Sequence, residues 1–224
     1  MLHSLTLFLQ IGAVASPAQP AVSHEHAPAA VVAPAQAQSR IKLVVAPTGN
    51  ETRFRVNETL VGMELPNDAV GRTGRITGAL VVQPNGQIVT AESRFEVELD
   101  SLVSDQANRD RYIKTNTLAT AQFPKAVFVP NSAKGLPARI PVAQDLTFEL
   151  VGDLTVRDVT KPVTWTVTGK MLPTGEISGT ATTTFTFADF NLQKPSVRRV
   201  LGVRDEIKLE YDFRLVPAPA TPDR

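Results

Sequence analysis

Residues 99–130 read LDSLVSDQANRDRYIKTNTLATAQFPKAVFVP, and this stretch decides how the rest of the chain is interpreted. It begins where one alternating segment ends and finishes inside another, 125–130. Between them lies a run without glycine or proline, preceded by Ser104 and Asp105, whose side-chain oxygens are typical helix caps. This order predicts one short helix, over 105–114, inserted between two strands.

Most of the remaining sequence alternates between apolar and polar residues. The clearest segments are 94–100, RFEVELD, and 207–215, IKLEYDFRL, in which every second residue is apolar. Strands with one apolar face are typical of antiparallel sheets, whereas parallel α/β sheets have strands that are apolar on both faces. About eight such segments, mostly joined by hairpin signals, predict an all-β fold, an eight-stranded antiparallel barrel with one short helix between strands.

Composition narrows the class of function. Of 224 residues, 42% are hydrophobic and 20% charged, and the net charge of +1 does not predict a nucleic-acid-binding surface. The chain has no cysteine, which excludes disulfides, thiolate metal sites and cysteine nucleophiles.

Four segments are predicted along the chain. Residues 1–15 contain an apolar run that ends in Ala-Val-Ala, which is typical of a signal peptide, although no Lys or Arg precedes the run. We therefore expect export to the periplasm or the extracellular space; a cytoplasmic tail is the alternative. Residues 16–39 form a Pro/Ala-rich disordered linker, 40–216 the folded domain, and 217–224 a disordered tail.

The sequence offers little catalytic chemistry. All three histidines, His3, His24 and His26, precede the folded domain, and the last two lack the further ligands that zinc requires. Arg109 and Asp110 form an acid–base pair only if adjacent helical residues face the same way, so a capping or tethering role is the alternative. We predict no enzymatic activity, no catalytic residue, no metal and no cofactor.

Four blocks of the sequence form a recognisable combination. They are Arg109-Asp110 with the following Phe123-Pro124, the hairpin 152–163 (GDLTVRDVTKPV), the segment 187–192 (FADFNL) and the closing strand 202–215. Together they resemble the YceI-like family of small lipocalin-like barrels. The resemblance covers about residues 40–215. In the hairpin, Asp158 stands where the family commonly has glycine, and aspartate tolerates left-handed geometry better than most residues.

The resemblance implies a function as well as a fold. Proteins of this family bind isoprenoid and other long-chain lipids, so the expected partner is a polyisoprenoid or fatty-chain lipid, held for sequestration, storage or transport. Tyr112-Ile113 replaces the family's usual His-Leu, and Thr117-Leu118 replaces a pair of aromatics. These departures from the family pattern bear on which lipid the chain binds.

The candidate ligand-binding residues are those on the apolar faces of the strands and on the helix. They are Phe54, Val56, Phe95, Val97, Leu99, Tyr112, Ile113, Phe128, Phe148, Trp165, Phe185, Phe187, Leu209 and Tyr211. The same residues are compatible with a solid core, which would make the chain a structural or adhesive β-domain. A third hypothesis is an enzyme that uses Arg109, Asp110 and Tyr112 on a bound lipid.

Basic residues gather at Arg198, Arg199 and Arg204. They form either a solvated loop with Asp205 and Glu206 as partners or a grip on an anionic headgroup or membrane surface. Transient contact with a membrane and a homodimer are both compatible with the sequence, and no nucleic-acid partner is expected.

Overall fold

The computed structural model describes residues 40–62, 67–137, 140–196 and 200–219, all of them within one compact unit, Gln38–Arg224. The predicted signal peptide and linker lie outside the described residues and stay predictions. Within the described ranges, no helix is long and apolar enough to cross a membrane.

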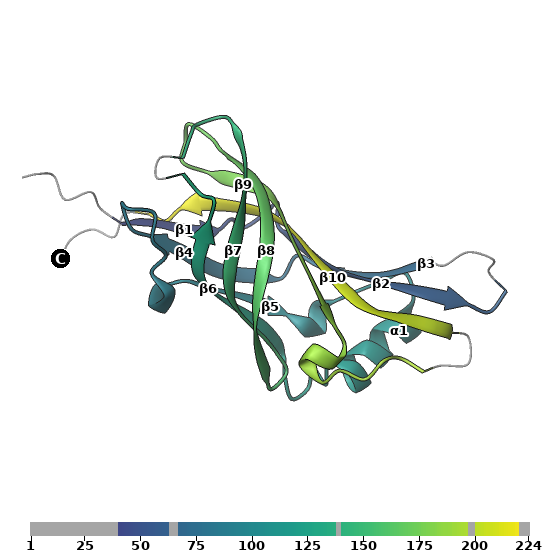
Figure 1. Cartoon of the computed structure of the whole chain (residues 1–224). Helices are drawn as coiled ribbons and strands as arrows, with labels where there is room; N and C mark the ends of the chain where they lie inside the picture. Colours follow the sequence, from purple (N-terminus) through teal and green to yellow (C-terminus); the bar gives the residue numbers. More distant parts are fainter. Residues whose placement is uncertain (1–39, 63–66, 138–139, 197–199, 220–224) are drawn as a thin grey trace, which may run out of the picture. The chain divides into compact units, whose positions relative to one another are not determined.

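Within these ranges, ten strands form one antiparallel sheet in the order β1-β4-β5-β6-β7-β8-β9-β10-β2-β3, and a further pairing between β1 and β10 closes a ring (Figure 1). The predicted eight-stranded antiparallel barrel with one short helix is therefore confirmed. The strands are β1 (Ile41–Val45), β2 (Glu51–Leu60), β3 (Asn67–Thr73), β4 (Ile76–Val82), β5 (Arg94–Glu98), β6 (Lys125–Lys134), β7 (Asp145–Val156), β8 (Val159–Met171), β9 (Ile177–Thr186) and β10 (Val200–Pro217).

Ten strands make an eight-stranded barrel because two of its eight strand positions, here called lines of the ring, are each filled by two shorter strands. Strands β1 and β2 follow one another along the same edge of β10, with Val45 opposite Leu215 and Thr52 opposite Tyr211. Strands β3 and β4 follow one another in the same way along β2 and β1. Each pair occupies the place of one long strand, so the ring contains eight lines of backbone.

Asn50 holds the break between β1 and β2 in place. Its amide nitrogen donates to Ala46 O at 2.9 Å. Its side-chain oxygen accepts from the Tyr211 hydroxyl at 2.8 Å and from Arg214 N at 2.9 Å. These bonds satisfy backbone groups that an interrupted ladder would leave unpaired, so β10 continues past the break.

The predicted helix lies between β5 and β6. It consists of α1 (Ala107–Tyr112) and a π-helical turn, η3 (Ile113–Thr117), in which Leu118 N donates to Ile113 O. The capping differs from the expectation, because the N-cap residue is Gln106 and its side chain makes no capping hydrogen bond. Asp110 instead reaches back and accepts from Ser104 N at 2.9 Å and from the Ser104 hydroxyl, which ties the helix to its own leading loop.

The hairpin between β7 and β8 corrects one detail of the sequence analysis. Val156 pairs with Val159, which leaves Arg157 and Asp158 as the two loop residues. The left-handed conformation belongs to Arg157, with φ 57°, and not to Asp158. Both common types of two-residue hairpin turn require a positive φ at the first loop position. That position is Arg157, so Arg157 adopts the left-handed conformation even though aspartate would tolerate it better.

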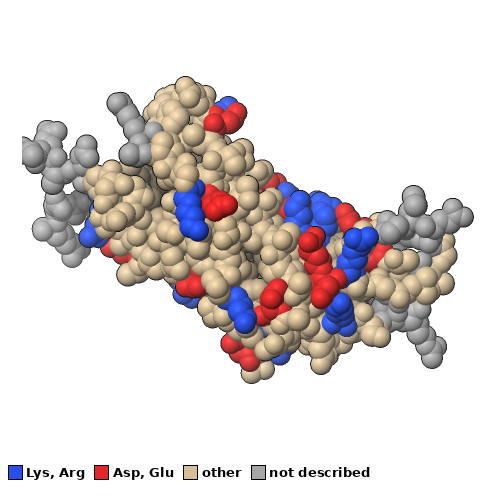
Figure 2. Space-filling view, viewed as in Figure 1, with Lys and Arg blue, Asp and Glu red and all other residues tan. Residues whose placement is uncertain are grey.

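A network of charges covers the outer faces of β2 and β10. Glu210 accepts from Lys208 Nζ at 2.9 Å, Arg53 Nε at 3.2 Å and Arg55 Nη2 at 3.4 Å. These bonds, with that of Lys208 the strongest, lower the pKa of Glu210 from 4.5 to about 2. Figure 2 shows positive and negative side chains intermingled on this part of the surface.

The lowered pKa of Glu210 predicts how stability depends on pH. Because the folded pKa lies below the unfolded one, the stabilisation is complete above about pH 4.5 and is lost as the pH falls towards 2. We expect the free energy of unfolding of the parent to fall by about 2 kcal/mol more than that of Glu210→Gln between pH 5 and pH 2. Urea unfolding over this range measures the difference, and identical pH profiles for the two proteins would contradict it.

Candidate functional site

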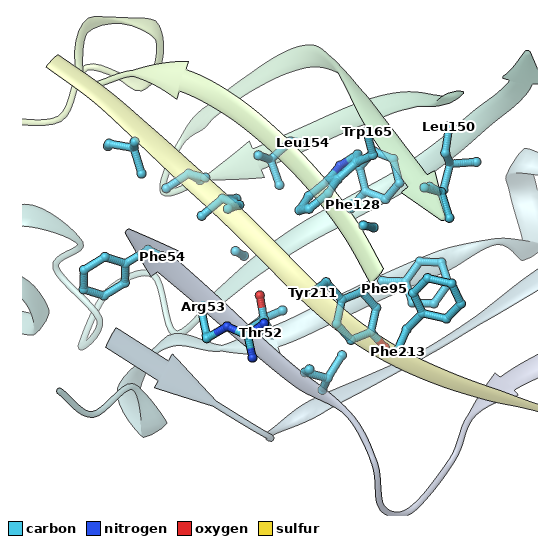
Figure 3. Close-up of a pocket in the computed structure, with 18 of the residues that line it drawn as sticks. Thr52, Arg53, Phe54, Phe95, Phe128, Leu150, Leu154, Trp165, Tyr211 and Phe213 are labelled. Atoms are coloured by element: carbon cyan, nitrogen blue, oxygen red, sulfur yellow. The ribbon is translucent and has the colours of Figure 1, made fainter. Parts of the chain in front are cut away.

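The barrel encloses a cavity of about 1210 Å³. This volume exceeds the roughly 300–1,000 Å³ of an ordinary small-molecule pocket. Its wall is built mainly from the inward-facing residues of the strands, and Figure 3 shows a part of it. A solid core, which the structural alternative requires, does not leave a space of this size.

The structure places all fourteen candidate ligand-binding residues on the wall of this cavity. Twelve of them come from the strands or from the turns directly after them, and Tyr112 and Ile113 come from the helical segment. That these residues contact a ligand stays a prediction.

Aromatic rings are concentrated on the strand walls. The ring of Phe128 on β6 meets that of Trp165 on β8 edge to face, with centroids 5.9 Å apart. On β10, the rings of Tyr211 and Phe213 lie 5.9 Å apart and tilted (Figure 3). The Tyr211 ring borders the cavity while its hydroxyl bonds to Asn50, and burial raises the pKa of this hydroxyl above its usual value. The Tyr211 ring is therefore part of the cavity wall, and its hydroxyl is bonded to Asn50 at the break between β1 and β2.

The two ends of the cavity differ in chemistry. One end lies among the β4–β5, β6–β7 and β8–β9 connections and is bordered mostly by apolar side chains, among them Ile88, Leu136, Ile140 and Met171. The other end lies beneath α1 and the far ends of β2 and β3. Polar residues border it, namely Glu58, Asn67, Asp105, Gln106, Asn108 and Arg109. We call this second region the polar end of the cavity.

An ion pair forms the core of the polar end. Glu58 follows Thr52, Phe54 and Val56 on the inward face of β2, and the residue is only 6% exposed. Arg109 reaches it from α1, and its Nη2 donates to Glu58 Oε1 at 2.6 Å, while its Nη1 donates to Asp105. The guanidinium thus connects the helix to the barrel wall through two carboxylates.

Two polar atoms on the cavity wall have no hydrogen-bond partner among the described residues. They are the hydroxyl oxygen of Thr117, at the end of the helical segment, and the indole nitrogen of Trp165, in the middle of β8. Both residues are strongly buried, Thr117 at 5% and Trp165 at 8% exposure. Buried polar groups are normally paired, so these two atoms are available to a ligand that occupies the cavity.

Glu58 was not predicted as a site residue, although its position in the sequence carries a signal. The alternation that places Phe54 and Val56 on the inward face also places Glu58 there, two residues further on. Its partner could not be found in the same way, since Arg109 lies 51 residues away along the chain. The tethering role considered for Arg109 and Asp110 agrees with their bonds to the loop before the helix, Arg109 to Asp105 and Asp110 to Ser104.

The basic cluster does not border the cavity in the part that the structure describes. Arg198 and Arg199 lie outside the described residues, and Arg204 is exposed and absent from the cavity wall. In the described ranges no three His, Cys, Asp or Glu side chains are placed to hold a metal ion.

Comparison with known proteins identifies the family. The model of the YceI-like domain matches residues 37–215. The chain belongs to the YceI-like family. Among its curated relatives is a UPF0312 protein of Pseudomonas putida, 38% identical over 111 residues, which cover 46% of this chain and 54% of that protein. A UPF0312 protein of Pseudomonas fluorescens is 35% identical over 112 residues, or 47% and 55% of the two chains. The chain thus spans about half the length of the curated relatives it matches.

Two solved structures share the family's barrel. A polyisoprenoid-binding domain from Saccharophagus degradans superposes with a TM-score of 0.59 at 12% identity, covering 80% of this chain and all of that one. BcnA of Burkholderia cenocepacia gives a TM-score of 0.55 at 15% identity, covering 78% and 99%. At these identities the likeness shows the fold alone.

Proposed function

We propose that the chain binds a polyisoprenoid or another long-chain amphiphilic lipid inside the barrel, for sequestration, storage or transport and without chemical conversion. The observation that carries the proposal is the cavity of about 1210 Å³, which is enclosed by one closed sheet and lined largely by aliphatic and aromatic side chains. The Saccharophagus degradans domain with the same fold is described as polyisoprenoid-binding, which supports this ligand class.

The energy of binding would come mainly from the tail. Each buried CH₂ group contributes about 0.8 kcal/mol before the cost of ordering the chain, so a long tail binds without any polar contact. Since one methylene more or less changes this sum little, the apolar wall discriminates poorly between tails of similar length. Specificity must therefore come from the polar end of the cavity.

Blocking the cavity tests the proposal. Leu209 lies mid-way along β10 and borders the cavity, so Leu209→Trp places a large ring in the space for the tail. We expect the variant to fold and to bind a fluorescent long-chain lipid analogue at least about tenfold more weakly than the parent does. Fluorescence titration measures the affinity, and circular dichroism checks the fold.

A matched control uses the same strand and the same new side chain. Glu206 is exposed on β10 and does not border the cavity, so Glu206→Trp adds an indole ring outside the barrel. This variant should bind the analogue as the parent does. Equal binding by the parent and a folded Leu209→Trp protein would show that the cavity is not the lipid site.

A further inference from the structure

In the part of the chain that the structure describes, five charged side chains border the cavity, and two of them are neutralised away from its polar end. They are Arg53, Glu58, Asp105, Arg109 and Lys170. Arg53 lies in the outer network, where its guanidinium bonds to Glu51, Glu210 and Asp212. Lys170 belongs to the end of β8 far from α1, and its Nζ lies 3.4 Å from Asp145.

Among the described residues that border the polar end, the remaining charges do not cancel. Glu58 and Asp105 supply two carboxylates, and Arg109 supplies one guanidinium, so these three side chains sum to −1. Both terminal nitrogens of Arg109 already donate to carboxylates. The single positive charge of Arg109 is therefore smaller than the summed negative charge of its two partners, Glu58 and Asp105.

Two of these three side chains are enclosed. Glu58 is almost fully buried and the side chain of Arg109 is only 16% exposed, whereas the side chain of Asp105 is 67% exposed and its charge is screened by solvent. An anionic headgroup that reaches this end would lie beside the buried carboxylate of Glu58, where like charges repel more strongly than in bulk water, and the guanidinium that could attract it is already shared between two carboxylates. A neutral or cationic headgroup avoids the repulsion.

Hydrogen-bond chemistry points to the same class of headgroup. Carboxylate oxygens only accept hydrogen bonds, and a carboxylate or fully ionised phosphate headgroup has no proton to donate to them. An alcohol, a primary amide or an ammonium group does donate. The hydroxyl of Thr117, buried and without a partner among the described residues, lies on the same helical segment and would complete the set by bonding to a carbonyl or hydroxyl oxygen.

We infer that this cavity selects amphiphiles whose polar end is uncharged or cationic and donates hydrogen bonds, and that Glu58 discriminates against carboxylate and phosphate headgroups. The inference rests on the proposed lipid binding and adds the class of headgroup and its place. The headgroup lies beneath α1 against Glu58, and the tail extends along the barrel towards Met171.

Four probes with the same octadecyl chain test this selectivity at pH 7: octadecanamide, octadecylamine, octadecanoate and octadecyl phosphate. Each competes with a neutral long-chain fluorophore for the full chain, below the concentration at which the probes form micelles. We expect the amide and the amine to bind at least about tenfold more tightly than the two anions.

Glu58→Gln then assigns the discrimination to one side chain. The substitution keeps the size of the side chain and removes its charge, so the two anions should bind more tightly and the gap should shrink to less than about threefold. Asp68→Asn is the matched control. Asp68 lies on β3 of the same hairpin, where it is exposed and bonds to Arg55, and it does not border the cavity. This control should keep the selectivity of the parent.

The outcomes separate the inference from the function on which it rests. If no probe displaces the fluorophore and the fluorophore itself does not bind, the proposed lipid binding fails and the inference fails with it. If all four probes bind the parent equally, or the anions bind more tightly, lipid binding stands and the headgroup selectivity is wrong. Because the comparison within the parent protein decides this point, it does not depend on how well Glu58→Gln folds.

Discussion

Lipid-free Phe190→Ala is expected to lose about 3–5 kcal/mol of its free energy of unfolding, whereas lipid-free Phe148→Ala should lose less than half as much. Phe190 is 1% exposed, meets the Phe185 ring edge to face at 4.6 Å and does not border the interior cavity. Its removal deletes an almost fully buried ring together with its contacts. Phe148 borders space that is already open, so its truncation enlarges a cavity and removes fewer contacts.

Equilibrium urea unfolding of delipidated protein measures both losses. Lipid binding should show the reverse order, with Phe148→Ala weakening it and Phe190→Ala leaving it close to that of the parent, because only Phe148 lines the cavity. Equally large losses of stability in the two lipid-free variants would mean that the interior is packed as a solid core, which would remove the basis for lipid binding.

Gly179→Val is the second change with a large expected effect. A Cβ at this position would lie 2.1 Å from Thr168 O and 2.5 Å from Gly169 Cα. These are backbone atoms of the paired strand β8, so no side-chain rotation relieves the clash, and the two strands must separate. We expect a loss of at least about 3 kcal/mol, or failure to fold, because overpacking against backbone is more costly than overpacking against side chains.

Gly202→Val is its control. Gly202 also lies in a strand, β10, and a Cβ there meets no atom within 4 Å. Its replacement should change the free energy of unfolding by no more than about 0.5 kcal/mol. Thermal unfolding of both variants provides the comparison, and a Gly179→Val protein as stable as the parent would show that β8 and β9 do not approach as closely as described.

Local patterns made most of the fold predictable. The alternation in 94–100 and 207–215 indicates which side chains face inward, because successive residues of a strand point to opposite faces. All the aromatic candidates therefore lie on the cavity wall. The predicted number of eight also describes the barrel, although the structure has ten strands. The breaks near Asn50 and Gly74 each divide one line of the barrel into two strands and add no line to it.

What the sequence did not indicate depends on contacts between distant residues. The pairing of Glu58 with Arg109 joins β2 to α1, and no local periodicity connects them. The positive φ of Arg157 depends on the pairing of Val156 with Val159, which fixes where the loop begins, and the more permissive Asp158 was the natural but wrong candidate. The size of the cavity likewise follows from closure of the ring rather than from any one segment.

The closure by β10 also determines when the barrel can form during synthesis. Strand β1 pairs with β10 through Val45 and Leu215, and β2 pairs with it through Thr52 and Tyr211, so each contact spans most of the domain. All the other strands of the ring precede β10 in the chain and are synthesised before it, but the ring cannot close until β10 has left the ribosome. Contacts of such long sequence separation slow folding, because the entropy of closing the chain is lost before the contacts form. We therefore expect the nascent domain to remain an open sheet, with its apolar face exposed, until β10 is made.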